Sequence, residues 1–182
     1  MQECRAGEWF ISNTRHGPMV HARLGIAQEN SGKLVALVRQ QARKLAQENE
    51  LDYIIIDGPP GIGCPVISSL SGVNLAVIIT EPTLSGIHDM ERILDVCQHF
   101  NVPTMVCVNK YDINDENTQA IRQYCKAHGV GADTLIPFDN VFTEAMVSGK
   151  SVVEYSDGRT ANEIRSLWQS IKSKLDEVPA TA

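Results

Sequence analysis

The chain has 182 residues, of which 43% are hydrophobic and 21% are charged, and its formal net charge is −6. This length and balance predict a single soluble domain, 1–182, that buries most of its apolar surface in one core. No apolar run approaches the length that a bilayer requires, and the acidic balance disfavours nucleic-acid binding through a basic surface. We therefore expect neither a membrane span nor a nucleic-acid partner.

The cysteines indicate a reducing compartment. There are five of them, without a C-x-x-C pair, and the first residues lack the basic start and apolar stretch of a secretory signal. An odd number of thiols in this context predicts a cytoplasmic protein without disulfides. Cys97, Cys107 and Cys125 lie within apolar patterns, so we expect buried, unreactive thiols and no metal site at these positions.

The beginning of the chain differs from the rest. Two strand-like runs, 9–11 and 19–24, are separated by a turn composition at 15–18. A helical pattern of apolar residues then covers 33–49. These features predict a strand-like extension over 1–30, ahead of an α/β core over 31–178.

The core contains four short runs of continuous apolar residues. They are residues 53–56, 75–80, 104–108 and 134–136. Continuous rather than alternating apolarity is typical of strands that are buried on both faces, as in a parallel sheet. Helical patterns cover 86–100, with Thr83 or Ser85 as its cap, and 115–128; a capping box at Thr160 and Glu163 predicts a final helix. The sequence therefore predicts a mostly parallel sheet with flanking helices.

A first candidate site follows the run at 53–56, where Asp57 precedes a turn rich in glycine and proline. Open α/β sheets place their ligands at the carboxyl ends of strands, and a carboxylate there can hold Mg²⁺ through water. Gly61 and Gly63 allow a backbone N–H to approach a phosphate closely. The alternative is a turn without function, because such turns are common after buried strands.

A second candidate site follows the runs at 104–108 and 134–136. Asn109, Lys110 and Asp112 form an N-K-x-D pattern, in which the amide suits the edge of a purine and the carboxylate suits the donors of guanine. The alternative is a polar turn between a strand and a helix. Pro137 and Asp139 follow the next strand in the same topological position, so we expect one polar rim at this edge.

These 182 residues contain no recognisable P-loop. Ser31-Gly32-Lys33 looks like the end of one, but Ala27 stands where the motif needs glycine and Leu34 stands where it needs Ser or Thr. We therefore interpret this segment as the start of a helix.

Four segments taken together, 57–65, 80–89, 108–110 and 136–139, resemble the MinD/ParA group of P-loop ATPases. The resemblance runs from about residue 7 to about residue 155, and is strongest to a branch with an inserted ferredoxin domain holding two 4Fe–4S clusters. It implies an incomplete three-layer P-loop NTPase fold and a dimeric ATPase that uses ATP and Mg²⁺. ATP is what the family implies, whereas the N-K-x-D spacing alone suggests GTP.

The resemblance also implies roles for individual residues. Asp57 bears on the Mg²⁺ ion and its water shell and is the one catalytic residue implied. The nucleotide-binding residues implied are Gly58, Pro59, Pro60, Gly61, Asn109, Lys110, Pro137 and Asp139. Among them the Gly61 amide senses the γ-phosphate, Asn109 contacts adenine, and Pro137 and Asp139 belong to the loop beside the base.

The departures from the family pattern decide what we expect of this chain alone. The Walker A loop, its strand and the cysteines of the ferredoxin insert are missing from these residues, so no 4Fe–4S ligands are expected here. We expect the C-terminal, ATP-binding half of an iron–sulfur ATPase, without hydrolysis of its own, forming a homodimer or associating with the missing N-terminal part. The alternative is a non-catalytic interaction module that pairs with a separate P-loop or ferredoxin subunit.

The missing strand also has a structural consequence. In the family it lies between the strands that correspond to 53–56 and 75–80. We therefore expect exposed edges in this chain and a stability below that of an ordinary domain of its length.

Overall fold

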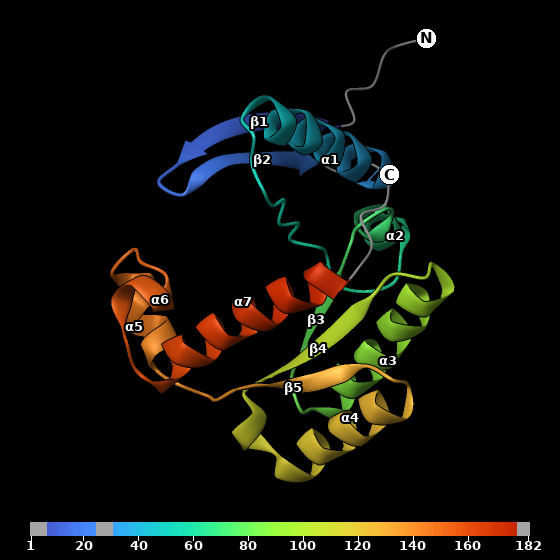
Figure 1. Cartoon of the computed structure of the whole chain (residues 1–182), viewed down its shortest axis with the longest axis vertical. Helices are drawn as coiled ribbons and strands as arrows, with labels where there is room; N and C mark the ends of the chain where they lie inside the picture. The colour runs from blue at the N-terminus through green and yellow to red at the C-terminus, as the bar shows by residue number, and fades with distance from the viewer. Residues whose placement is uncertain (1–6, 25–30, 178–182) are drawn as a thin grey trace. The chain divides into compact units, whose positions relative to one another are not determined.

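The structure is a computed structural model, and it describes residues 7–24 and 31–177 (Figure 1). The chain divides into two compact units, Met1–Ser71 and Gly72–Ala182, which we call unit 1 and unit 2. No helix within the described residues is both long and apolar enough to cross a membrane.

Unit 1 begins with the hairpin that the sequence predicts. Strand β1 (Gly7–Thr14) pairs antiparallel with β2 (Gly17–Leu24), and Thr14 lies opposite Gly17 across the turn. Ser12 Oγ and His21 Nε2 lie 2.9 Å apart across the two strands. Helix α1 (Ser31–Glu48), which confirms the helix predicted at 33–49, contacts β2.

An arginine joins α1 to α2 (Cys64–Leu70). The Arg39 guanidinium donates to the carbonyl oxygens of Ser68 and Ser71, at the carboxyl end of α2. A cation is favourable there because the last carbonyls of a helix carry partial negative charge and have no partner within the helix. Burial, and after it the charge of Arg43, lowers the pKa of Arg39.

The strand predicted at 53–56 is wrong for this structure. The segment forms no strand, and the described strands pair only within the hairpin or within the sheet of unit 2. Ile54 and Ile55 are 42% and 82% exposed, although they belong to a continuous apolar run. A strand requires a neighbouring strand to satisfy its backbone groups, and local apolarity does not supply one.

Unit 2 is built on a parallel sheet with the strand order β3–β4–β5. Strands β3 (Ala76–Thr80), β4 (Thr104–Asn109) and β5 (Gly131–Ile136) confirm three of the predicted strands. Val106 and Val108 of β4 belong to the main core, while Cys107, whose side chain points to the opposite face, is also fully buried. Both faces of β4 are therefore covered, as continuous apolarity predicts.

Helices α3 (Leu84–His99) and α4 (Asp115–Ala127) complete this core, and they confirm the helices predicted at 86–100 and 115–128. Met90 and Leu94 of α3 meet Ile121 and Cys125 of α4 in one buried cluster with β4. Thr83 is the N-cap of α3, because its side chain accepts a hydrogen bond from the Gly86 N–H at 3.0 Å. The predicted cap is thus confirmed, with Thr83 rather than Ser85 in that place.

The chain ends with three helices after β5: α5 (Val141–Val147), α6 (Val152–Tyr155) and α7 (Arg159–Glu177), of which α7 contacts β5 (Figure 1). The capping box predicted at Thr160 is wrong. The helix begins one residue earlier, and Thr160 is buried within its first turn. A capping box does occur between Ser151 and Glu154, at the start of α6.

The three thiols predicted to be buried are buried. Cys97, Cys107 and Cys125 are inaccessible to solvent, whereas Cys64 is exposed at the start of α2. Burial raises the pKa of Cys107 and of Cys125 to about 11. These thiols are therefore packing groups in the neutral form.

Candidate functional site

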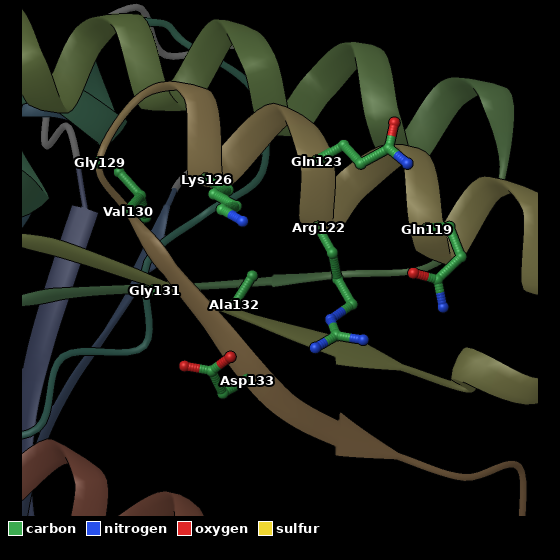
Figure 2. A pocket seen from close by; sticks show the side chains of 9 residues that line it. All are labelled: Gln119, Arg122, Gln123, Lys126, Gly129, Val130, Gly131, Ala132 and Asp133. Atoms are coloured by element: carbon green, nitrogen blue, oxygen red, sulfur yellow. The ribbon is translucent and has the colours of Figure 1, made fainter.

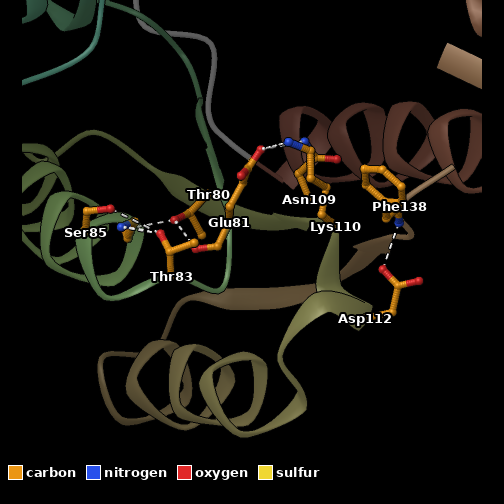
Figure 3. Close-up of polar contacts among 9 residues, drawn as sticks. Thr80, Glu81, Thr83, Ser85, Asn109, Lys110, Asp112 and Phe138 are labelled. Atoms are coloured by element: carbon orange, nitrogen blue, oxygen red, sulfur yellow. Dashed lines mark hydrogen bonds and ion pairs between the residues drawn. The ribbon is translucent and has the colours of Figure 1, made fainter. Parts of the chain in front are cut away.

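The carboxyl ends of the three unit 2 strands carry a group of polar side chains. Glu81 follows β3, Asn109 ends β4 and Lys110 comes next, while Asp139 follows β5 by three residues. We call Glu81, Asn109, Lys110, Asp112 and the loop 137–139 the rim (Figure 3). Parallel strands bring their carboxyl ends to one edge of a sheet, which explains why residues so far apart in sequence meet here.

Glu81 is the centre of the rim. Its Oε1 atom lies 2.7 Å from Lys110 Nζ, and Asn109 Nδ2 donates to the same oxygen at 3.5 Å. The two side chains of the ion pair are 38% and 39% exposed. The carboxylate therefore joins the end of β3 to the end of β4 (Figure 3).

The backbone of Lys110 is left-handed, with φ of 52°. This conformation costs a residue other than glycine roughly 1–2 kcal/mol. A half-exposed ion pair contributes at most about 1 kcal/mol to the free energy of unfolding. The ion pair offsets part of this cost, and Glu50 and Asn101 have the same backbone conformation in turns, so the conformation does not by itself mark a site.

Asp112 lies in the short 3₁₀ helix Tyr111–Ile113 and reaches across to the loop after β5. Its Oδ1 atom accepts a hydrogen bond from the Phe138 N–H at 2.8 Å. The Phe138 ring is 60% exposed, so this bond holds an apolar ring at the surface of the rim. The N-K-x-D pattern therefore includes a carboxylate that already has a partner within the chain.

Pro137 and Asp139 support the same loop from within. Pro137 is buried, and the Asp139 carboxylate accepts hydrogen bonds from the Thr160 hydroxyl and, at 3.0 Å, from the Val141 N–H. The Thr160 bond, and after it the Val141 bond, lowers the pKa of Asp139. Both carboxylate oxygens are thus engaged in holding the loop to α5 and α7.

The turn from β3 into α3 is closely packed beside Glu81. The Thr80 hydroxyl donates to the Gly86 carbonyl at 2.9 Å, and a Cβ atom on Gly86 would lie 2.4 Å from the Glu81 carbonyl oxygen. Asn117 of α4 donates to the Pro82 carbonyl at 3.0 Å. These contacts fix the backbone that carries Glu81.

The other predicted site residues, 57–61, lie in unit 1. Asp57 is exposed, and Gly61 has a φ of 90°, a conformation that favours glycine. Gly63 is the N-cap of α2, where Pro65 has no backbone N–H and the Val66 N–H donates to the Gly63 carbonyl at 3.0 Å. The structure thus divides the predicted residues into two groups, one in each unit.

The described residues fit an iron–sulfur cluster poorly. No three potential metal-ligating side chains come together among them, and their cysteines are either buried in the core or, for Cys64, isolated at the surface. Asp57 would contribute one carboxylate ligand to an Mg²⁺ ion. This is the usual protein contribution when water and phosphate supply the remaining ligands.

A groove of about 490 Å³ lies elsewhere in unit 2, between α4 and the outer edge of β5 (Figure 2). Arg122, Lys126 and Asp133 line it together with glutamine side chains. Its lining carries both signs of charge, so the chemistry does not select a ligand. The rim, and not this groove, is the candidate site.

Solved structures place the fold in a class. The chain is similar to the septum site-determining protein MinD complexed with Mg-ADP from Pyrococcus horikoshii, with a TM-score of 0.61 and 20% identity over 77% of this chain and 56% of that one. The fold is therefore a MinD-like α/β fold, with a parallel sheet, flanking helices and an N-terminal antiparallel hairpin.

The family follows from the sequence. Residues 30–172 match the ParA family described as the NUBPL iron-transfer P-loop NTPase, and this chain belongs to that family. It is 29% identical to an uncharacterized protein of Methanocaldococcus jannaschii over 85% of this chain and 51% of the relative. It is 26% identical to the iron–sulfur cluster carrier protein of Pyrococcus furiosus over 81% of this chain and 54% of that protein. The chain spans about half the length of these relatives.

Glu81 is a site residue that the sequence interpretation did not single out. The available signal was its position, since an acidic residue directly follows a buried strand, one sheet neighbour away from Asn109.

Proposed function

We propose that this chain is the nucleotide-binding part of an iron–sulfur cluster carrier ATPase, with the rim of unit 2 receiving the base of ATP. The observation that carries the proposal is the rim itself, where Glu81 holds Lys110 and Asn109 together at adjoining strand ends. Family membership and the carrier relatives support the cluster-related role, and the Mg-ADP complex of the MinD relative supports an adenine nucleotide.

The base is held between apolar and polar groups in this proposal. The exposed Phe138 ring supplies a flat apolar surface, and Asn109 supplies a planar amide with both donor and acceptor atoms. Lys110 neutralises Glu81 beside them. Pro137 and Asp139 act by shaping the loop that carries Phe138, because Pro137 is buried and both Asp139 oxygens have partners.

Taken by itself, the loop 57–61 of unit 1 has groups suited to phosphate and Mg²⁺ in this proposal. Asp57 orients water on the ion, and the positive φ of Gly61 lets its amide approach the γ-phosphate without a side chain in the way. Gly58, Pro59 and Pro60 set the path of this loop. We expect it to differ between nucleotide states.

Hydrolysis by these 182 residues alone should be negligible. Phosphoryl transfer depends on positioning and on neutralising charge, and these residues contain no P-loop lysine motif to do so. The iron–sulfur ligands of the assembled carrier are likewise expected outside the described residues. A homodimer, or association with an N-terminal part that supplies the P-loop, would complete the site.

An exposed apolar stretch favours the second candidate, an interaction module that pairs with a separate P-loop chain. Tyr53, Ile54 and Ile55 are 47%, 42% and 82% exposed. Contiguous exposed apolar surface is typical of positions that another chain covers. Light scattering of the chain, alone and with such a partner, separates the homodimer from the pairing.

The proposed site is tested by binding of a fluorescent ATP analogue, mant-ATP, in the presence of Mg²⁺. Asn109→Ala removes the amide that contacts the base and should weaken binding about tenfold, since one good bidentate contact to a base is worth roughly 1–3 kcal/mol. Gln123→Ala, on α4 beside the groove, is the matched control and should bind as the original chain does. If both variants bind mant-ATP with equal affinity, the rim is not the site that binds the base.

A further inference from the structure

We propose that Glu81 makes the site selective for adenine over guanine by fixing the orientation of the Asn109 amide. The inference rests on the proposed function and adds a specificity-determining residue to it. Glu81 does not touch the base. It acts through Asn109 and is therefore a positioning residue.

The orientation follows from the chemistry of the contact. An ionised carboxylate has only acceptor atoms, so the group that Asn109 turns toward Glu81 must be its NH₂. With the amide reversed, two oxygen atoms would face each other at the observed 3.5 Å, without a hydrogen between them. Lys110, 2.7 Å from the same Glu81 oxygen, compensates its charge and holds the carboxylate in place.

The atoms left to a ligand are therefore defined. Asn109 retains Oδ1 as an acceptor and one hydrogen of its NH₂ group as a donor. Adenine presents an exocyclic NH₂ donor beside the N7 acceptor, and these match Oδ1 and the remaining N–H. Guanine presents O6, an acceptor, where adenine has its NH₂ group, so two acceptors would meet at Asn109 Oδ1.

The test compares mant-ATP and mant-GTP binding to the 182-residue chain and to Glu81→Leu. Leucine fills a similar volume but has no hydrogen-bonding atoms, so either orientation of the Asn109 amide becomes possible. We expect the original chain to prefer mant-ATP, and Glu81→Leu to lower that preference about tenfold, mainly by binding mant-GTP better. Glu91→Gln on α3 removes an equal charge away from the rim and should leave the ratio unchanged.

The outcomes separate the inference from the function on which it rests. An unchanged ATP-to-GTP ratio in Glu81→Leu, with mant-ATP still bound, overturns the inference and leaves the adenine site standing. Absence of mant-ATP binding to the original chain, and to a complex with a P-loop partner, overturns the proposed function.

A second measurement needs no nucleotide. NMR of the Asn109 side-chain NH₂ group should show one amide proton shifted by the Glu81 carboxylate. Glu81→Leu should abolish that shift, and Glu91→Gln should keep it. The same NH₂ spectrum in all three chains would overturn the inference whether or not nucleotide binds.

Discussion

Strand β4 and the segment 53–56 have the same kind of sequence and different surroundings. Val106, Cys107 and Val108 of β4 have no exposed surface, while Ile55 is 82% exposed. β4 has a strand on each side, whereas none of the described strands pairs with 53–56. An apolar run can therefore form a strand, but whether it does so depends on neighbouring strands that are distant in sequence.

The largest effect should come from truncating one apolar side chain in each region. Leu94→Ala in the core of unit 2 should lower the free energy of unfolding by about 2–5 kcal/mol, because it leaves a cavity among fully buried neighbours. Ile55→Ala should change it by less than about 0.5 kcal/mol, because little contact is lost. Urea unfolding followed by circular dichroism measures both.

The comparison fails if Ile55→Ala costs as much as Leu94→Ala. That result would mean that 53–56 is covered in solution, by another copy or by pairing within the chain. Repeating the measurement over a range of protein concentrations distinguishes these cases, since only association depends on concentration.

Much of unit 2 could be predicted from the sequence because its signals are local. The helices over 86–100 and 115–128 have an apolar face and a cap within a few residues. The position of Thr160 in its helix could not be predicted from local signals. Its partner, Asp139, lies 21 positions earlier, and the contact with that carboxylate buries Thr160 inside the first turn, where the local pattern predicts a cap. Glu81 was missed for the same reason, since its role depends on β3 and β4 being neighbours.

Alkaline pH should weaken unit 2 through its buried thiols. Burial raises the pKa of Cys107 and Cys125 to about 11 in the folded chain, above the ordinary value of 9.0. Their contribution to stability is fully present below about pH 9 and is lost between about pH 9 and pH 11, because only the unfolded chain releases these protons there. Urea midpoints measured from pH 8 to 11 should fall over this interval.

Two variants test whether the buried thiols cause this loss of stability at alkaline pH. Cys107→Ala should flatten the alkaline decline while lowering stability at neutral pH. Cys64→Ser, at an exposed position in unit 1, should leave the decline as steep as before. An unchanged slope in Cys107→Ala would show that other groups carry the effect.

The smallest effects should come from the two helix caps. Thr83→Ala removes the hydroxyl that accepts from the Gly86 N–H and should cost about 1 kcal/mol. Gly63→Asp adds an acceptor to a cap that has none, at a backbone conformation that any residue adopts, and should gain a few tenths of a kcal/mol, roughly. Thermal unfolding detects both shifts, and opposite signs are expected.

A matched pair controls for side-chain effects unrelated to capping. Thr83→Ser keeps the hydroxyl and should retain most of the stability, while Gln98→Ala, at an exposed position near the other end of α3, should change little. If Thr83→Ser is as unstable as Thr83→Ala, packing of the threonine methyl group and not the hydrogen bond stabilises the start of α3.

Gly86 makes part of the rim unusually resistant to engineering. In an ordinary helix, replacing glycine by alanine gains about 1 kcal/mol, so the change is a standard choice for stabilisation. Here the added methyl group would meet the Glu81 carbonyl oxygen at 2.4 Å, which forces the backbone of the positioning residue to move. A substitution chosen to stabilise the protein would thus displace the Glu81 backbone, and a survey of tolerated changes should find position 86 closed to every other amino acid.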